Sequence, residues 1–188
     1  MTRAELEHVI RAAADIADDE EIVVIGSQSI LGQFPDAPAS LRASVEADVF
    51  PKNRPERADL IDGSIGEGSP FHATYGYYAH GVDETTAVLP AGWRERLVAV
   101  RNPNTRGATG WCLEVHDLVI AKAIAGRERD YDFVREVIRH GLVDRATVLE
   151  RIERVPVDQA TRDRVRTALE TMFRTTGPVL PQPGRSLR

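Results

Sequence analysis

The chain has 188 residues, 42% of them hydrophobic, and a formal net charge of −5. This length and apolar content suit one domain, or a compact domain with a helical appendage. No run approaches the roughly 18 apolar residues of a membrane span, and no signal peptide precedes the first expected helix, so we expect a cytoplasmic protein without a membrane partner. The single cysteine, Cys112, excludes an internal disulfide and is expected to be a buried structural thiol.

The first expected elements are a helix and a strand. Residues 2–5 have the capping-box form, and apolar residues then recur at helical spacing to about residue 17. Four apolar residues, 22–25, indicate a buried strand. These segments predict a helix that leads directly into the sheet.

The strand is broken by Gly26 and Ser27, after which residues 28–31 can begin a short helix. Glycine at a strand-to-helix turn lets backbone N–H groups approach a phosphate closely. Ordinary turn chemistry is the alternative interpretation of the same pair.

Twenty positions after Gly26, apolar and acidic residues alternate over residues 45–49. In a strand, Glu46 and Asp48 would project from one face and their apolar neighbours from the other. Neighbouring carboxylates repel each other, so they are tolerated when solvated or when a divalent cation lies between them. The wet face of an amphipathic strand is the alternative to a metal site.

The rest of the chain is expected to be β-rich first and helical afterwards. A glycine-rich loop is expected over residues 62–70, after which the apolar pattern changes from period 2 to helical period at residue 117. The expected strands cover residues 71–82, 85–89, 97–101 and 111–115, and the expected helices cover 56–61, 117–125, 129–140, 144–152 and 158–173.

This pattern predicts three parts. Residues 1–115 form an α+β head, residues 116–174 form a helical half packed on it with a groove between them, and residues 175–188 form a disordered tail rich in proline. The junction lacks the composition of a flexible linker, so we expect one folded body.

Two blocks of sequence together resemble the nucleotidyltransferase superfamily. The first is the hydrophobic strand, Gly26-Ser27 turn, short helix and acid-x-acid strand; the second, residues 113–130, is similar to the D-L-x-x-x-K-x-x-A-x-R-x-x-D segment of AbiEii-type nucleotidyltransferases. Those proteins include toxins of bacterial toxin–antitoxin and phage-defence systems. Residues 71–96 resemble an uncharacterised bacterial branch of the fold still more closely, and the whole resemblance covers about residues 21–140.

The resemblance implies an α+β fold with a nucleotidyltransferase-type mixed β-sheet, flanking helices and a C-terminal helical half. It also implies a nucleoside triphosphate as ligand and Mg²⁺ as cofactor. By that resemblance Gly26 and Ser27 would hold the triphosphate, Glu46 and Asp48 would ligate Mg²⁺, and Lys122 would reach a phosphate, with Arg127 and Asp130 completing that side of the pocket.

Simpler interpretations of the helical residues stay open. Lys122 would be costly to bury without an anionic partner, and Glu114 or Asp117 would serve as well as a phosphate. Arg127 and Asp130 have the i, i+3 spacing of a helix ion pair. Asp117 has the character of a helix N-cap.

The sequence departs from the superfamily in one respect. A third carboxylate on a later strand usually completes the metal site, yet residues 71–82 contain no acid. His80 lies within that stretch and is a candidate base, although a hydrogen-bonded strand histidine is the simpler interpretation. Asp83, Glu84 and Glu114 are the other candidates by position.

Three hypotheses follow for function. The leading one is transfer of a nucleoside monophosphate from NTP·Mg²⁺ to an RNA or protein hydroxyl. The alternative, motivated by the missing acid, is a catalytically degenerate member that binds a partner, such as a cognate antitoxin or toxin. A nucleic-acid-binding module is disfavoured by the negative charge, because its basic cluster would consist only of Arg94, Arg96, Arg101 and Arg106, which also suit a solvated sheet edge.

Overall fold

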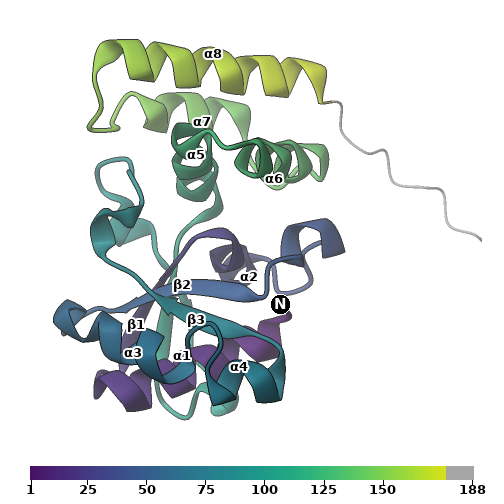
Figure 1. The fold of residues 1–188 in the computed structure, drawn as a ribbon. Coiled ribbons are helices and arrows are strands. Elements are labelled where there is room, and N and C mark those ends of the chain that lie inside the picture. The colour runs from purple at the N-terminus through teal and green to yellow at the C-terminus, as the bar shows by residue number, and fades with distance from the viewer. Residues whose placement is uncertain (177–188) are drawn as a thin grey trace, which may run out of the picture.

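The computed structural model describes residues 1–176 and is built on a five-stranded mixed sheet with the order β3-β2-β1-β5-β4 (Figure 1). Strand β1 pairs antiparallel with β2 and parallel with β5, and β2 pairs parallel with β3. The expected α+β class with a mixed sheet is confirmed. The strands are β1 (Glu21–Ile25), β2 (Glu46–Pro51), β3 (Tyr78–Gly81), β4 (Val98–Val100) and β5 (Thr109–Cys112).

Helices flank the sheet and form most of the C-terminal part of the chain (Figure 1). Within residues 1–176, none of them combines the length and apolar character needed to cross a membrane. The helices are α1 (Arg3–Ala17), α2 (Ile30–Gln33), α3 (Ala58–Ile65), α4 (Pro70–Tyr75), α5 (Val115–Ala125), α6 (Glu128–Arg139), α7 (Arg145–Ile152) and α8 (Gln159–Thr175).

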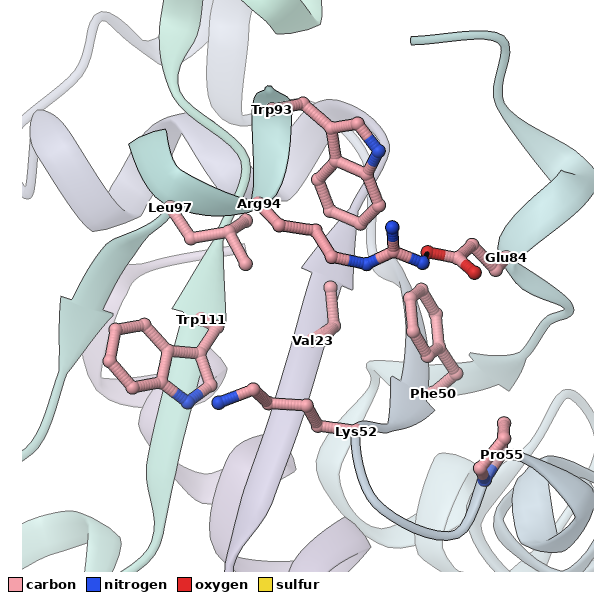
Figure 2. Close-up of a pocket in the computed structure, with 9 residues that line it drawn as sticks. All are labelled: Val23, Phe50, Lys52, Pro55, Glu84, Trp93, Arg94, Leu97 and Trp111. Atoms are coloured by element: carbon pink, nitrogen blue, oxygen red, sulfur yellow. Dashed lines mark hydrogen bonds and ion pairs between the residues drawn. The ribbon is translucent and has the colours of Figure 1, made fainter. Parts of the chain in front are cut away.

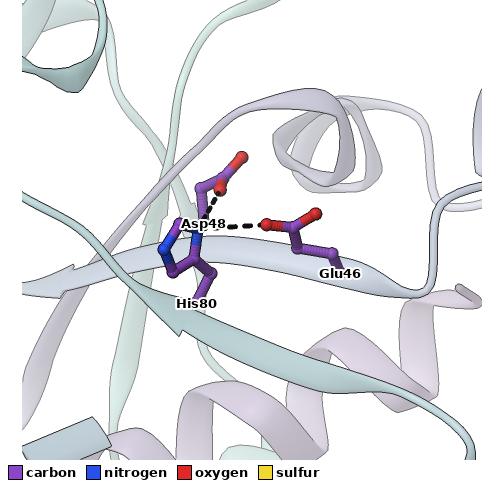
Figure 3. Close-up of side chains that lie close together, drawn as sticks. All are labelled: Glu46, Asp48 and His80. Atoms are coloured by element: carbon purple, nitrogen blue, oxygen red, sulfur yellow. Dashed lines mark ion pairs between the residues drawn. The ribbon is translucent and has the colours of Figure 1, made fainter. Parts of the chain in front are cut away.

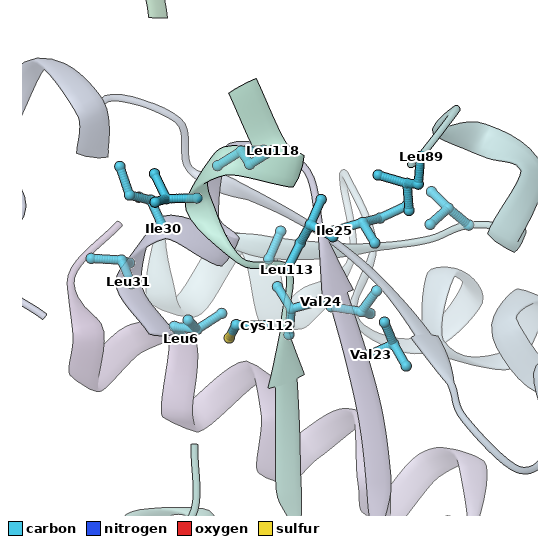
Figure 4. Packing of buried hydrophobic residues seen from close by; sticks show 14 of the residues in the cluster. Leu6, Val23, Val24, Ile25, Ile30, Leu31, Leu89, Cys112, Leu113 and Leu118 are labelled. Carbon is cyan, nitrogen blue, oxygen red and sulfur yellow. The ribbon is translucent and has the colours of Figure 1, made fainter. Parts of the chain in front are cut away.

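One face of the sheet packs against α1 and α3. A Cβ at Gly110 would lie 2.3 Å from Ile10 Cδ1 of α1, and one at Gly81 would lie 2.1 Å from the Ala58 carbonyl oxygen at the start of α3. Both helices therefore approach the strand backbone closely because glycine stands there. Cys112 is fully buried near Leu6 on this side (Figure 4), and burial raises the pKa of its thiol to about 12, so the prediction of a structural thiol is confirmed.

Helix α5 joins the sheet to the other C-terminal helices, which pack around it. Its Asp117 is completely buried and accepts hydrogen bonds from Arg96 Nε at 2.7 Å and from Arg151 Nη1 at 3.1 Å. A buried carboxylate needs such partners. The N-cap of α5 is Glu114, not Asp117, since Glu114 accepts the hydrogen bond of the His116 backbone N–H.

Several expected boundaries were wrong. Residues 71–82 do not form one strand, because Ser69 caps α4, Pro70 occupies its first turn, and only β3 remains extended. Residues 85–89 contain no strand and begin with a 3₁₀ turn at Glu84–Thr86. Helix α3 continues to Ile65, into the expected loop. Thr175 belongs to α8, and residues 177–188 of the expected tail lie outside the described part of the chain.

Candidate functional site

Glu46 and Asp48 lie on the sheet face opposite α1 and α3, at the end of β1. Both belong to β2, two residues apart, and the alternating burial of this strand places Ala47 and Val49 in the core beneath them. Asp48 pairs with Ile25, the last residue of β1, so its side chain stands beside the turn that follows. The sequence pattern and the strand pairing thus bring the two carboxylates and the Gly26-Ser27 turn together.

Gly26 is the point where the turn meets Asp48. Its φ of +71° and ψ of −171° belong to a region that only glycine adopts readily. A Cβ at this position would lie 2.0 Å from Asp48 Oδ2, far inside van der Waals contact. The Gly26 carbonyl accepts hydrogen bonds from Ser29 Oγ at 2.8 Å and Ser29 N at 3.2 Å, which hold the turn. The backbone therefore approaches the carboxylate as closely as it does because Gly26 has no side chain.

His80 of β3 is the third polar group at this position. Because β2 and β3 are parallel with Asp48 opposite His80, the imidazole projects from the same face as the acids. Its Nδ1 lies 3.0 Å from Glu46 Oε1 and 3.4 Å from Asp48 Oδ1 (Figure 3). One donor atom from each of the three residues lies within 4.8 Å of the other two, which is an arrangement that can hold a metal ion. We call these three residues the β2–β3 cluster.

The surroundings of Asp48 in the cluster shift the pKa of its carboxyl. Burial, and then the neighbouring charge of Glu46, raise the pKa of the Asp48 carboxyl, while His80 and Lys122 oppose the rise. The raised pKa means that the anionic form of Asp48 is disfavoured here. A cation placed between the two carboxylates would relieve this repulsion, so the donor set fits a divalent ion.

Lys122, Arg127 and Asp130 also come together, at the junction of α5 and α6. Lys122 Nζ donates to Asp130 Oδ1 at 2.9 Å, and Arg127 Nε lies 4.0 Å from Asp130 Oδ2. Asp130 is buried, whereas Arg127 is exposed. Lys122 therefore has an anionic partner, which is neither Glu114 nor Asp117. It is also close enough to Asp48 to lower the pKa of that carboxyl, so it belongs to the electrostatic surroundings of the cluster.

A cavity of about 180 Å³ opens on the same sheet face as the β2–β3 cluster (Figure 2). The pairing of Val23 with Phe50 and Trp111 puts these side chains on that face, and Phe50 follows Asp48 by two residues. Two residues of a strand span about 7 Å, so the cavity begins one side chain from the acids. Its lining consists of Val23, Phe50, Lys52, Pro55, Glu84, Trp93, Arg94, Leu97 and Trp111.

The cavity combines aromatic surface with paired charges. Lys52 Nζ lies 4.6 Å from the centre of the Trp111 ring and 2.7 Å from Glu21 Oε1, and Arg94 pairs with Glu84. Both cations are therefore held in place near the opening.

The structure does not assemble the four arginines of the expected basic cluster into one patch. Arg96 turns inward to the buried Asp117, whereas Arg94 pairs with Glu84 and lines the cavity. The alternative of a solvated sheet edge is therefore wrong for Arg96. The sequence did not indicate the cavity-lining tryptophans, because Trp111 of β5 has the character of a core strand residue and Trp93 lies in a 3₁₀ turn that no motif marks.

Comparison with protein families gives a match to this chain, whereas no curated protein and no solved structure matches it. The family described as nucleotidyltransferase of unknown function, DUF6036, matches residues 4–174. That match covers the sheet, the β2–β3 cluster and the C-terminal helices, so the chain belongs to this family of nucleotidyltransferases.

Proposed function

We propose that the protein binds a nucleoside triphosphate with a divalent cation and transfers the nucleoside monophosphate to a hydroxyl of an RNA or protein acceptor. One observation carries the proposal: Glu46 and Asp48 project side by side from β2, and Asp48 lies directly against the backbone of Gly26. Transfer of a nucleotidyl group needs a carboxylate pair for the cation and a backbone turn for the phosphates in such proximity.

Each residue of the site has a role in this proposal. Glu46 and Asp48 hold the cation, Mg²⁺ in the simplest case, which when bound would neutralise phosphate charge and polarise the α-phosphorus. Gly26 and Ser27 orient the triphosphate through the backbone of their turn, which the missing side chain of Gly26 allows to lie directly against Asp48 and therefore beside the cation. Lys122, held by Asp130, contributes positive charge on the side of α5, and Arg127 extends that charge towards solvent.

The reaction is an in-line displacement at the α-phosphorus. The acceptor oxygen forms a new P–O bond while the bond to the bridging oxygen of the β-phosphate breaks, and pyrophosphate leaves with that electron pair. The hydroxyl proton is released to solvent, which reaches the partly exposed cluster.

The cavity beside the cluster supports an acceptor that carries an aromatic ring, as the end of an RNA does. Phe50, Trp93 and Trp111 line the cavity with aromatic rings. Lys52 and Arg94 lie over the two tryptophan rings and pair with Glu21 and Glu84, so an acceptor would take the place of these cations on the rings and of the carboxylates as their anionic partner. A volume of about 180 Å³ is below that of a typical site for a drug-sized ligand and suits a single ring system.

Binding measurements on an isosteric variant test the proposal. Asp48→Asn removes one carboxylate charge without changing the shape of the side chain, so nucleotide and cation affinity are expected to fall together. Asp132→Asn is the matched control, because Asp132 is exposed on α6 and pairs only with Arg135 among the described residues. Isothermal titration with each nucleoside triphosphate gives the affinities. Unchanged binding in Asp48→Asn would contradict the proposal.

A second candidate function follows from the composition of the cluster. Within residues 1–176 the group of side chains that can hold a metal contains two carboxylates and a histidine, not three carboxylates. A site of this kind suits a member that binds nucleotide but acts by binding a partner, such as a cognate antitoxin or toxin of the AbiEii type. Tight nucleotide binding without any transfer to RNA or protein would favour this function over the enzyme.

A further inference from the structure

His80 is the third member of the β2–β3 cluster. It stands opposite Asp48 in the parallel β2–β3 pair, and its Nδ1 is directed at both acids (Figure 3). The pairing of β2 with β3 already places His80 and the two acids on one face of the sheet. The side chain of His80 is about half exposed, so the cluster lies at the surface and not in the core.

The distances within the cluster match those between ligands of one octahedral ion. With bonds of about 2.1 Å, neighbouring ligand atoms lie about 3 Å apart and opposite ones about 4.2 Å apart. The observed separations are 3.0 Å from His80 Nδ1 to Glu46 Oε1 and 3.4 Å to Asp48 Oδ1. These two separations, and the three donor atoms lying within 4.8 Å of one another, suit ligands of a single ion.

The donor set distinguishes between ions. Mg²⁺ prefers oxygen ligands, whereas imidazole nitrogen favours first-row transition ions. Two carboxylate oxygens and one imidazole nitrogen form a mixed set, in which the nitrogen adds more to the affinity for a transition ion than for Mg²⁺.

We propose that His80 is a metal ligand, and that the β2–β3 cluster binds a first-row divalent transition ion such as Mn²⁺ more tightly than Mg²⁺. The inference rests on the proposed function for the place of the cation, but its test needs neither nucleotide nor transfer. The competing interpretation is that His80 only donates a hydrogen bond to the acids. In that case the loss of the imidazole would leave the preference between the two ions unchanged.

The test uses Mn²⁺ as the probe on the full chain without nucleotide. Electron paramagnetic resonance of free Mn²⁺ gives its affinity, and competition gives that of Mg²⁺. We expect His80→Asn to weaken Mn²⁺ binding by about tenfold or more, which is about 1.4 kcal/mol, while Mg²⁺ binding changes much less. His80→Asp creates an all-oxygen set and should shift the preference towards Mg²⁺. The control is His140→Asn, which changes an exposed histidine at the end of α6.

Electron spin echo modulation gives a readout that a purely structural role would not change. Bound Mn²⁺ should show coupling to an imidazole ¹⁴N in the wild type and in His140→Asn, and not in His80→Asn. Absence of this coupling in the wild type, or equal Mn²⁺ affinity in the wild type and His80→Asn, would overturn the inference. If the ¹⁴N coupling is seen but no nucleotide transfer occurs, the inference about His80 stands and the proposed enzyme is contradicted. If transfer occurs without the coupling, the proposed enzyme stands and the inference about His80 is contradicted.

Discussion

Gly26→Ala should lower both the thermal stability of the protein and its affinity for a cation, and the two effects can be measured separately. The conformation at φ +71° and ψ −171° costs a residue with a Cβ about 1–3 kcal/mol. For a chain of this size that strain lowers the melting temperature by roughly 2–12 °C. The new methyl group would also lie 2.0 Å from Asp48 Oδ2, so the carboxylate must rotate away from the place where it could share an ion with Glu46.

Thermal unfolding and Mn²⁺ titration measure the two effects. In an Asp48→Ala background the clash with the carboxylate is removed and only a contact of 3.3 Å with the remaining Cβ is left, so Gly26→Ala should then cost little more than its backbone strain. The difference between the two backgrounds is the coupling energy of the pair. Gly63→Ala is the control: Gly63 lies within α3 with open space around it, and alanine there should stabilise the helix by about 0.5–1 kcal/mol. A Gly26→Ala protein with wild-type melting temperature and cation affinity would refute the reasoning.

Other predictions concern buried polar groups. Asp117→Ala leaves two arginines without their buried partner and should cost about 3–5 kcal/mol in urea unfolding. Lys122→Met deprives the buried Asp130 of its closest cation, and should lower both stability and nucleotide affinity in the same titrations. Gln28→Met should raise the melting temperature, because both amide atoms of the buried Gln28 lack a protein partner within residues 1–176; an unchanged or lower value would mean that the amide is satisfied in solution. Burial alone would raise the pKa of Glu114, but hydrogen bonds from His116 and Arg151 hold it at about 2, below the usual 4.5. The stabilisation that Glu114 contributes is therefore complete above pH 4.5 and is lost as the pH falls towards 2. Glu114→Gln should flatten the profile of stability against pH over that interval.

The parts of the fold that depend on local pattern could be predicted from the sequence. The alternation at residues 45–49 gives a strand with Glu46 and Asp48 on one face, because side-chain direction in a strand has period 2. Helix α4 was missed although Ser69 and Pro70 are a standard helix start, because the tyrosines after them favour a strand. Here a local capping signal outweighed the β-propensity of the aromatic residues.

The composition of the candidate site depended on information that no local pattern contains. The sequence indicates His80 as a candidate base, but its place opposite Asp48 follows from the parallel pairing of β2 with β3. Helices α3 and α4 separate these two strands along the chain. The partner of Lys122 likewise depends on how α6 folds back on α5. Strand register and helix packing are tertiary properties, so the sequence predicted the acids and left the third group of the cluster open.

The measurement that tests the central claim most directly is nucleotide transfer with labelled substrates. Each nucleoside triphosphate is supplied with the label at the α- or at the γ-phosphate, together with Mg²⁺ or Mn²⁺ and bacterial RNA, in parallel for wild type, Asp48→Asn and the Asp132→Asn control. The account predicts that the α-label moves to RNA or protein with release of pyrophosphate, in the wild type and the control but not in Asp48→Asn, and that the γ-label never moves to the acceptor. Transfer of the γ-label, or equal α-transfer by Asp48→Asn, would contradict it.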